Sequence, residues 1–279
     1  MEHVITTTGL ARWERRLENI PPIAWLGLQA AALWTHWRWA ASRLADGSDD
    51  PLGLAALAVL VWAVWRLAPR MLGTPRAGWL AAALALSGAA TASVFFAPPL
   101  LGAVLAALAL ACGLRAFLPA GQPWLPMAGL MVLALPVVSS MQFYAGYPLR
   151  VVTAQLSTWA LQLAGMDAVR SGSAMQVDGR LVIVDAPCSG VQMVWLAYFC
   201  ACAVAVIGGL RERRFVRALP FIGLLVMAGN ALRNTLLVGL EATSVAVSEA
   251  MHQAIGLLVL AAVCGAVVAV VRGGRDAQA

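Results

Sequence analysis

The chain has no lysine and little charge of any kind. Charged residues make up 11% of its 279 residues, the 19 basic residues are all arginine, and mean hydropathy is +0.81. Charged residues make up about a quarter of a typical soluble domain, so this composition excludes a soluble domain. It predicts instead an all-α, polytopic membrane helix bundle, because backbone groups in lipid must be satisfied inside helices.

Cysteine is also scarce, and its pattern excludes several kinds of site. The five cysteines form no CxxC pair and no cluster with histidine, so we expect no metal centre and no organic cofactor. Packing is the ordinary role of a cysteine inside an apolar stretch, which is where four of them stand: Cys112, Cys200, Cys202 and Cys264. Cys188 differs, because it stands where a polar segment meets a long apolar run.

Two further absences narrow the cellular context. No basic stripe interleaves with exposed aromatic residues, which argues against a nucleic-acid partner and leaves membrane lipids as the surroundings. Residues 1–20 are polar and lack an apolar signal-peptide core, so we predict a cytoplasmic N-terminal segment without a cleaved signal.

Apolar stretches predict about eight transmembrane helices in a single membrane domain, 1–279. Each has roughly the 17–25 residues that a bilayer core requires. They are 22–41, 51–69, 77–97, 98–118, 123–141, 188–209, 217–239 and 251–271. The first two are the weakest, because His36, Arg38 and Arg66 interrupt them, and Pro98-Pro99 must form a tight turn between the third and fourth.

The distribution of arginine predicts the orientation. Cytoplasmic loops are enriched in basic residues, and eight spans return the C-terminus to the side of the N-terminus. With both ends in the cytoplasm, most arginines lie inside and most acidic residues lie outside. We therefore predict a protein of the plasma (inner) membrane, N-in and C-in.

An unusually long extracytoplasmic loop, 142–187, precedes the sixth predicted span. Leu149–Ala164 has apolar residues at helical spacing and is suited to lie on the membrane surface. Residues 175–185 are typical of a short hairpin, with Asp178-Gly179 at the turn. The loop leads to Cys188. Two roles for it are equally open: it could cover an active site, or it could serve only as a structural cap.

Three residues that are costly in a membrane converge at one depth in the region 188–271. Cys188 begins the sixth span at its outer end, and His252 begins the eighth at the same face. The seventh span enters the membrane from the cytoplasmic side at Arg217, and Arg233 lies 16 residues further on. At 1.5 Å per residue this is about 24 Å, which places Arg233 close to the outer side of the bilayer. A thiol, a permanent cation and an imidazole in one layer predict a nucleophile with acid/base partners.

Each member of this group suits a role in acyl transfer. A thiolate is favoured at a helix N-terminus, where Cys188 follows the polar Asp185, and the N–H groups of Ser189 and Gly190 can bind an oxyanion. Arg233 suits stabilisation of a thiolate or oxyanion, and His252 suits proton transfer. The supporting residues lie close to these two in the sequence: Asn230, Arg233 and Asn234 fall at i, i+3 and i+4 on one helix face, while Glu249 precedes His252 by three residues and would orient it if both face inward.

The motifs resemble the exosortase/archaeosortase family of membrane transpeptidases. The resemblance rests on Ala186-Pro187-Cys188-Ser189-Gly190 at the start of a late span, Asn230-Ala231-Leu232-Arg233 in the next, and His252 with Gly256 in the last. The order Cys, Arg, His is similar to the bacterial exosortase type. The first four predicted spans support the resemblance only through their hydropathy.

This resemblance implies a function and a set of partners. Such enzymes recognise a C-terminal sorting signal of secreted proteins (PEP-CTERM-like: a Pro-Glu-Pro-like motif, a transmembrane helix and a basic tail), cleave near the motif and transfer the protein to a cell-surface acceptor. By that analogy Cys188 is the nucleophile, Arg233 its electrostatic partner and His252 the acid/base. The acceptor nucleophile is not identified by the sequence.

Two other functions remain open on the residues alone. A transporter would use Arg233 for an anionic substrate, but it needs a polar pathway, and the inner halves of the last three spans are almost uniformly apolar. A non-catalytic subunit of polysaccharide or surface-protein export would tolerate loss of all three residues. An intramembrane serine protease is disfavoured, because Ser189 stands in a Cys-Ser-Gly and not in a Gly-x-Ser-x-Gly context.

Overall fold

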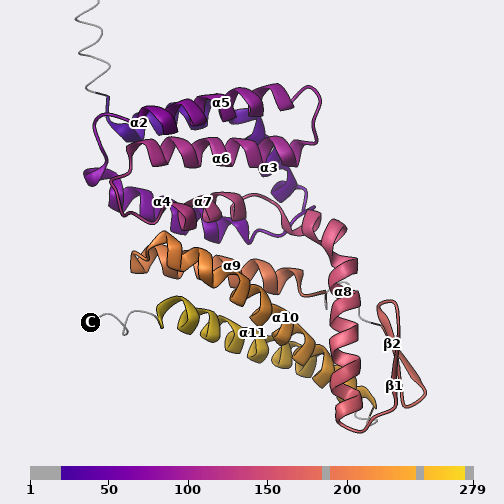
Figure 1. Ribbon diagram of the computed structural model, residues 1–279. Coiled ribbons are helices and arrows are strands. Elements are labelled where there is room, and N and C mark those ends of the chain that lie inside the picture. The colour runs from indigo at the N-terminus through magenta and orange to yellow at the C-terminus, as the bar shows by residue number, and fades with distance from the viewer. Residues whose placement is uncertain (1–19, 184–188, 243–247, 274–279) are drawn as a thin grey trace, which may run out of the picture. The chain divides into compact units, whose positions relative to one another are not determined.

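Helices dominate the computed structural model, which describes residues 20–183, 189–242 and 248–273 (Figure 1). Within these ranges there are ten α-helices, one 3-10 helix and one three-stranded antiparallel sheet. Five of the described helices are long and apolar enough to cross a bilayer, or six if α7 (Trp124–Leu133) and α8 (Val138–Leu163) count as one span. The predicted membrane helix bundle is confirmed, whereas the count of eight spans is not.

The first of two compact units, Met1–Leu135, is built around helix α6 (Pro99–Phe117). The other helices of this unit are α2 (Pro22–Ala32), α3 (Trp34–Ala45), α4 (Gly53–Leu67) with the 3-10 turn η1 (Ala68–Arg70), α5 (Ala77–Ser93) and α7. Helix α6 packs against α2, α3, α5 and α7 with a face rich in glycine and alanine, which permits close helix approach. The predicted turn at Pro98-Pro99 is confirmed, since α5 ends at Ser93 and α6 begins at Pro99.

The first predicted span, 22–41, is not one continuous helix, because α2 ends before Leu33 and α3 begins after it. The break accompanies the burial of His36, whose Nε2 lies 3.2 Å from the carbonyl oxygen of Ala90. Gly102 makes room for this ring, since a Cβ there would lie 2.7 Å from His36 Cε1. The imidazole that weakened the hydropathy signal is therefore a buried, hydrogen-bonded packing residue of the first unit.

The second compact unit, Pro136–Ala279, contains three apolar helices, the helix α8 and the sheet. The three helices α9 (Val191–Gly208), α10 (Glu212–Ala242) and α11 (Glu249–Arg272) pack against one another, and α8 packs against α9 and α10. Figure 1 shows α8 crossing this group near the end where α9 and α11 begin and α10 ends. All of the candidate site residues that the structure describes are found at this end of the unit.

The prediction of a single fifth span, 123–141, is wrong in its extent. Helix α7 ends at Leu133, and α8 begins at Val138 beyond Pro136. A residue before proline is disfavoured in the α conformation, which accounts for an interruption here. Much of the predicted loop 142–187 is then the continuation of α8, so the helix expected over 149–164 is present as its second half.

The sheet consists of β1 (Ala168–Ser171), β2 (Ala174–Val177) and β3 (Arg180–Ile183) in the order β1-β2-β3. The predicted hairpin is confirmed as β2–β3, with positive φ at both turn residues, 48° at Asp178 and 79° at Gly179. Strand β1 was not foreseen. Buried Met175 and Val177 belong to a core shared with Leu161 of α8 and Val238 of α10, so the sheet is anchored to the helices beside the site.

Candidate active site

The structure describes seven of the nine predicted site residues. Cys188 and Asp185 lie outside the described residues, and their roles stay predictions. The other seven are carried by the start of α9, the last third of α10 and the first turn of α11.

Arg233 and His252 are in direct contact. Arg233 Nη2 of α10 lies 3.1 Å from His252 Nε2 of α11, and both side chains are half-buried. A guanidinium has only donors, so Nε2 accepts this hydrogen bond and the neutral ring carries its proton on Nδ1. The two residues that the sequence placed at one depth therefore form a cation–imidazole pair.

Gly256, one turn after His252, provides the surface on which the guanidinium lies. A Cβ at this position would be 3.2 Å from Arg233 Nε and 3.5 Å from both Cζ and Nη2. The absence of a side chain here lets the guanidinium lie this close to α11 without a shift. The pairing of His and Gly in the last motif therefore has a geometric reason, because one residue binds the guanidinium and the other makes room for it.

The two asparagines that flank Arg233 face a different helix. Asn230 Nδ2 donates to Thr153 Oγ1 of α8 at 2.8 Å, and Asn234 Nδ2 donates to Ser157 Oγ at 3.0 Å. Ser157 Oγ in turn donates to the carbonyl oxygen of Ala231 at 3.2 Å. The polar stripe predicted on this helix is thus divided, with the asparagines turned to α8 and the arginine turned to α11.

The chain enters α9 through a tightly constrained glycine. Gly190 has φ of 84°, in the left-handed region, and a Cβ there would lie 2.8 Å from Cγ and Nδ2 of Asn230. Beside it, Ser189 Oγ donates to Gln142 Oε1 of α8 at 2.7 Å and accepts from the N–H of Val191 at 3.3 Å. The two residues that follow Cys188 in the sequence are therefore fixed against α8 and α10.

Glu249 does not occupy the orienting position suggested by the sequence. It is exposed and accepts a hydrogen bond from Gln253 Nε2 at 3.0 Å, while the polar contact at His252 Nε2 comes from Arg233. Helix α11 begins instead with Ser248 as its N-cap, whose side chain accepts from the N–H of Met251.

The sequence reasoning missed the contribution of α8. Gln142 binds Ser189, the residue after Cys188, while Thr153 and Ser157 are fully buried and bind the asparagines three before and one after Arg233. A signal was available, because Thr153 and Ser157 are four residues apart and so share one face of the amphipathic segment. The sequence suggests a position at the membrane surface for this segment but does not show which helix its polar face binds.

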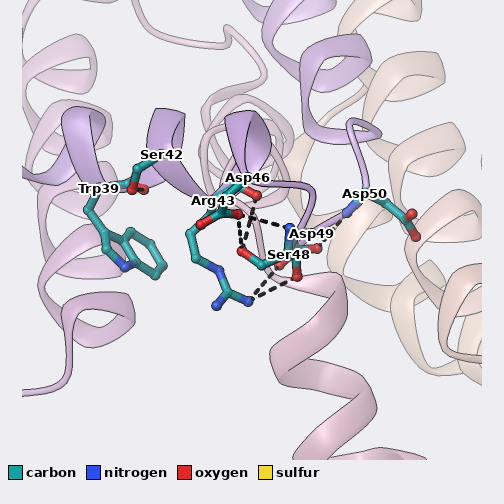
Figure 2. A network of polar contacts seen from close by, with 7 residues as sticks. All are labelled: Trp39, Ser42, Arg43, Asp46, Ser48, Asp49 and Asp50. Carbon is teal, nitrogen blue, oxygen red and sulfur yellow. Dashed lines mark hydrogen bonds and ion pairs between the residues drawn. The ribbon is translucent and has the colours of Figure 1, made fainter.

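A second polar cluster lies in the turn between α3 and α4 (Figure 2). Arg43 Nη2 lies 3.8 Å from Asp49 Oδ2, and the side chain and N–H of Ser48 both bind Asp46 Oδ1. The hydrogen bond from the Ser48 hydroxyl, followed by that from its N–H, lowers the pKa of Asp46 below its ordinary value. Among the described residues no three His, Cys, Asp or Glu side chains are grouped to hold a metal ion. We therefore interpret this cluster as a set of local hydrogen bonds at the end of α3 and not as a binding site.

The fold and this site define a class: a helical membrane protein in which an arginine and a histidine from adjacent spans meet at the end where a third span begins. A sequence model of the transmembrane exosortase family (Exosortase_EpsH) matches residues 34–269, which is most of the chain, and the chain belongs to this family. No curated protein and no solved structure matched the chain.

Proposed function

We propose that the protein is a membrane cysteine transpeptidase that cleaves a C-terminal sorting signal and transfers the remaining protein to an acceptor. Cys188 would be the nucleophile, Arg233 the electrostatic partner and His252 the acid/base. The observation that carries the proposal is the 3.1 Å contact between Arg233 and His252, in a chain that belongs to the exosortase family.

The chemistry of this pair supports acyl transfer. A fixed guanidinium stabilises negative charge on a thiolate or an oxyanion, and an imidazole moves protons near neutral pH. In the contact described here, Nε2 faces the guanidinium; His252 would first take the proton of the Cys188 thiol, and the resulting imidazolium would be the acid for the leaving group. Release of Nε2 from Arg233 would make it a proton acceptor, so the pair is suited to both halves of a proton-transfer cycle.

The reaction then balances in two steps. His252 takes the proton of the Cys188 thiol, and the thiolate attacks the carbonyl carbon of the scissile peptide bond. A C–S bond forms, the C–N bond breaks, and the leaving amine takes the proton from the His252 imidazolium. In the second step the acceptor nucleophile gives its proton to His252 and attacks the thioester. The C–S bond breaks and the thiolate is restored. No oxidant or cofactor is required.

The family and the charge pattern support the proposed substrate and its orientation. A sorting signal with a transmembrane helix and a basic tail fits a substrate whose tail is cytoplasmic, because basic residues are retained on that side. We propose the same rule for the enzyme, N-in and C-in in the plasma membrane, with its site at the extracytoplasmic face. Most arginines flank the predicted cytoplasmic ends.

Co-expression with a tagged secreted reporter that ends in a PEP-CTERM-like signal tests this function. We expect a smaller reporter on an immunoblot with the wild-type protein and an unprocessed one with Cys188→Ala. Processing that persists in Cys188→Ala would remove the thiol as nucleophile. If Arg233→Ala alone abolished function while Cys188→Ala did not, a transporter would be the better description, and tolerance of both changes would indicate a non-catalytic subunit.

A further inference from the structure

We infer that helix α8 is a positioning element of the active site, and that Thr153 and Ser157 hold α10 in the register that brings Arg233 to His252. The inference rests on the proposed function, because it assigns these hydroxyls a role in that chemistry. Their hydroxyls bind Asn230, Asn234 and Ala231 and not the side chains of Arg233 and His252, so they are positioning residues and not catalytic ones.

The first argument is the placement of the hydrogen bonds. They bind Asn230 and Asn234, the residues three before and one after Arg233, and the carbonyl of Ala231 between them. One turn of α10 is thus attached to α8 at three points, and the guanidinium leaves that turn in the other direction, toward α11. Rotation or sliding of α10 would break these bonds and carry Arg233 away from His252.

The second argument is burial. Thr153, Ser157, Asn230 and Asn234 are each at most 5% exposed, in a region where the surrounding side chains are largely apolar. A buried hydroxyl or amide without a partner is unfavourable, so alternative registers of α10 that lose these bonds are disfavoured. Ser157 both accepts from Asn234 and donates to Ala231, which defines one register more narrowly than a single bond would.

The third argument is that α8 binds the other end of the site as well. Gln142, near the start of α8, accepts from the hydroxyl of Ser189, the residue after Cys188 in the sequence. One helix therefore attaches to both segments that carry the proposed nucleophile and its cationic partner. The sheet is packed on the same helix and on Val238 of α10, which strengthens this attachment.

The chain offers matched variants at neighbouring positions. Thr153→Val removes the hydroxyl and keeps the shape, whereas Thr153→Ser keeps the hydroxyl and removes the methyl group. Thr158 is also buried on α8, but its hydroxyl donates to Ala154 within the same helix at 2.8 Å. Thr158→Val therefore removes an equivalent buried hydroxyl that does not reach α10.

The test measures reporter processing by purified protein in detergent. For Thr153→Val we expect kcat to fall roughly tenfold with KM unchanged, since small misplacements of a catalytic group reduce turnover by up to about 100-fold. Thr153→Ser should recover most of this loss, and Thr158→Val should match wild type. Equal kcat for Thr153→Val and wild type would overturn the inference, as would equal losses for Thr153→Val and Thr158→Val, which would indicate only damage to α8.

A second readout needs no substrate and separates this inference from the proposed function. Alkylation of Cys188 by iodoacetamide, followed by mass spectrometry at pH 7 and pH 9, reports how far its thiolate is stabilised. We expect the pH 7 rate, relative to pH 9, to fall in Thr153→Val and in Arg233→Ala, but not in Thr158→Val. If Arg233→Ala alters nothing, the proposed role of Arg233 fails; if Arg233→Ala lowers the ratio and Thr153→Val does not, the positioning role fails.

Discussion

Gly256→Ala tests the contact between α10 and α11 with the addition of a single methyl group. The new Cβ would lie 3.2 Å from Arg233 Nε and 3.5 Å from Cζ, so the guanidinium must move by a few tenths of an ångström to restore ordinary contact. The present Nη2–Nε2 distance is 3.1 Å, and a shift of about 0.4 Å along it would exceed the range of about 2.7–3.2 Å for good hydrogen bonds.

The expected effect is on turnover and not on folding. Because a misplacement of about 1 Å costs up to roughly 100-fold, a few tenths of an ångström should reduce kcat about three- to tenfold. Alanine is favoured over glycine in a helix interior by about 0.5–1 kcal/mol, so stability should not fall. The variant should therefore be as heat-resistant as wild type, or more so, and less active.

The matched control is Gly265→Ala in the same helix, where a new Cβ meets nothing within 4 Å. It gains the same helix propensity without touching the guanidinium. The assay is the initial rate of reporter processing in detergent, alongside a thermal unfolding curve for each variant. Equal rates for Gly256→Ala and Gly265→Ala would refute the argument that the guanidinium must lie against α11.

Three further predictions follow from neighbouring contacts. Gly190→Ala should reduce the yield of folded protein far more than Gly209→Ala, as measured by expression level and thermal stability. Both glycines have positive φ, but only a Cβ at position 190 would meet another group, the side chain of Asn230. Asn234→Ala should lower stability by about 0.6–1.7 kcal/mol by removing a donor from Ser157, measured by unfolding in mixed micelles, and an unchanged midpoint would contradict it. Glu249→Gln should change kcat less than twofold, since the Glu249 carboxylate is exposed and bound to Gln253, and a tenfold loss would restore the orienting role suggested by the sequence.

Much of the fold was accessible from the sequence because lipid simplifies the problem. A helix that must satisfy its own backbone in hydrocarbon needs a long apolar run, so the limits of α6, α9 and α11 were predicted within three residues and those of α10 within five. The hairpin turn at Asp178-Gly179 was also predictable, because positive φ at two successive residues has a strong sequence preference.

The predictions were wrong where hydropathy does not show that a helix is interrupted. The break at Leu33 has no proline or glycine beside it in the sequence, and it accompanies the burial of His36 against α5. The early end of α7 was signalled by Pro136, but an apolar run on both sides concealed it. In each case a tertiary contact or a local steric rule outweighed a continuous apolar pattern.

The sequence predicted the membrane depth of the site residues but not the helix that each side chain faces. Counting residues along α10 and α11 placed Arg233 and His252 in one layer, and they are in contact. The same periodicity grouped Asn230 and Asn234 with Arg233, although the asparagines turn to α8. Side chains one turn apart diverge enough to reach two different helices, and the sequence does not say which helix lies on which side.

The central claim is that Cys188 forms the acyl bond. The most direct measurement is to incubate the wild-type protein with the tagged reporter, without an added acceptor, and to look by electrophoresis for a reporter–enzyme adduct that neutral hydroxylamine releases, as it does a thioester. The proposed mechanism predicts this adduct in wild type, a lower yield in Arg233→Ala, and none in Cys188→Ala. Reporter cleavage by Cys188→Ala at the wild-type rate would contradict it.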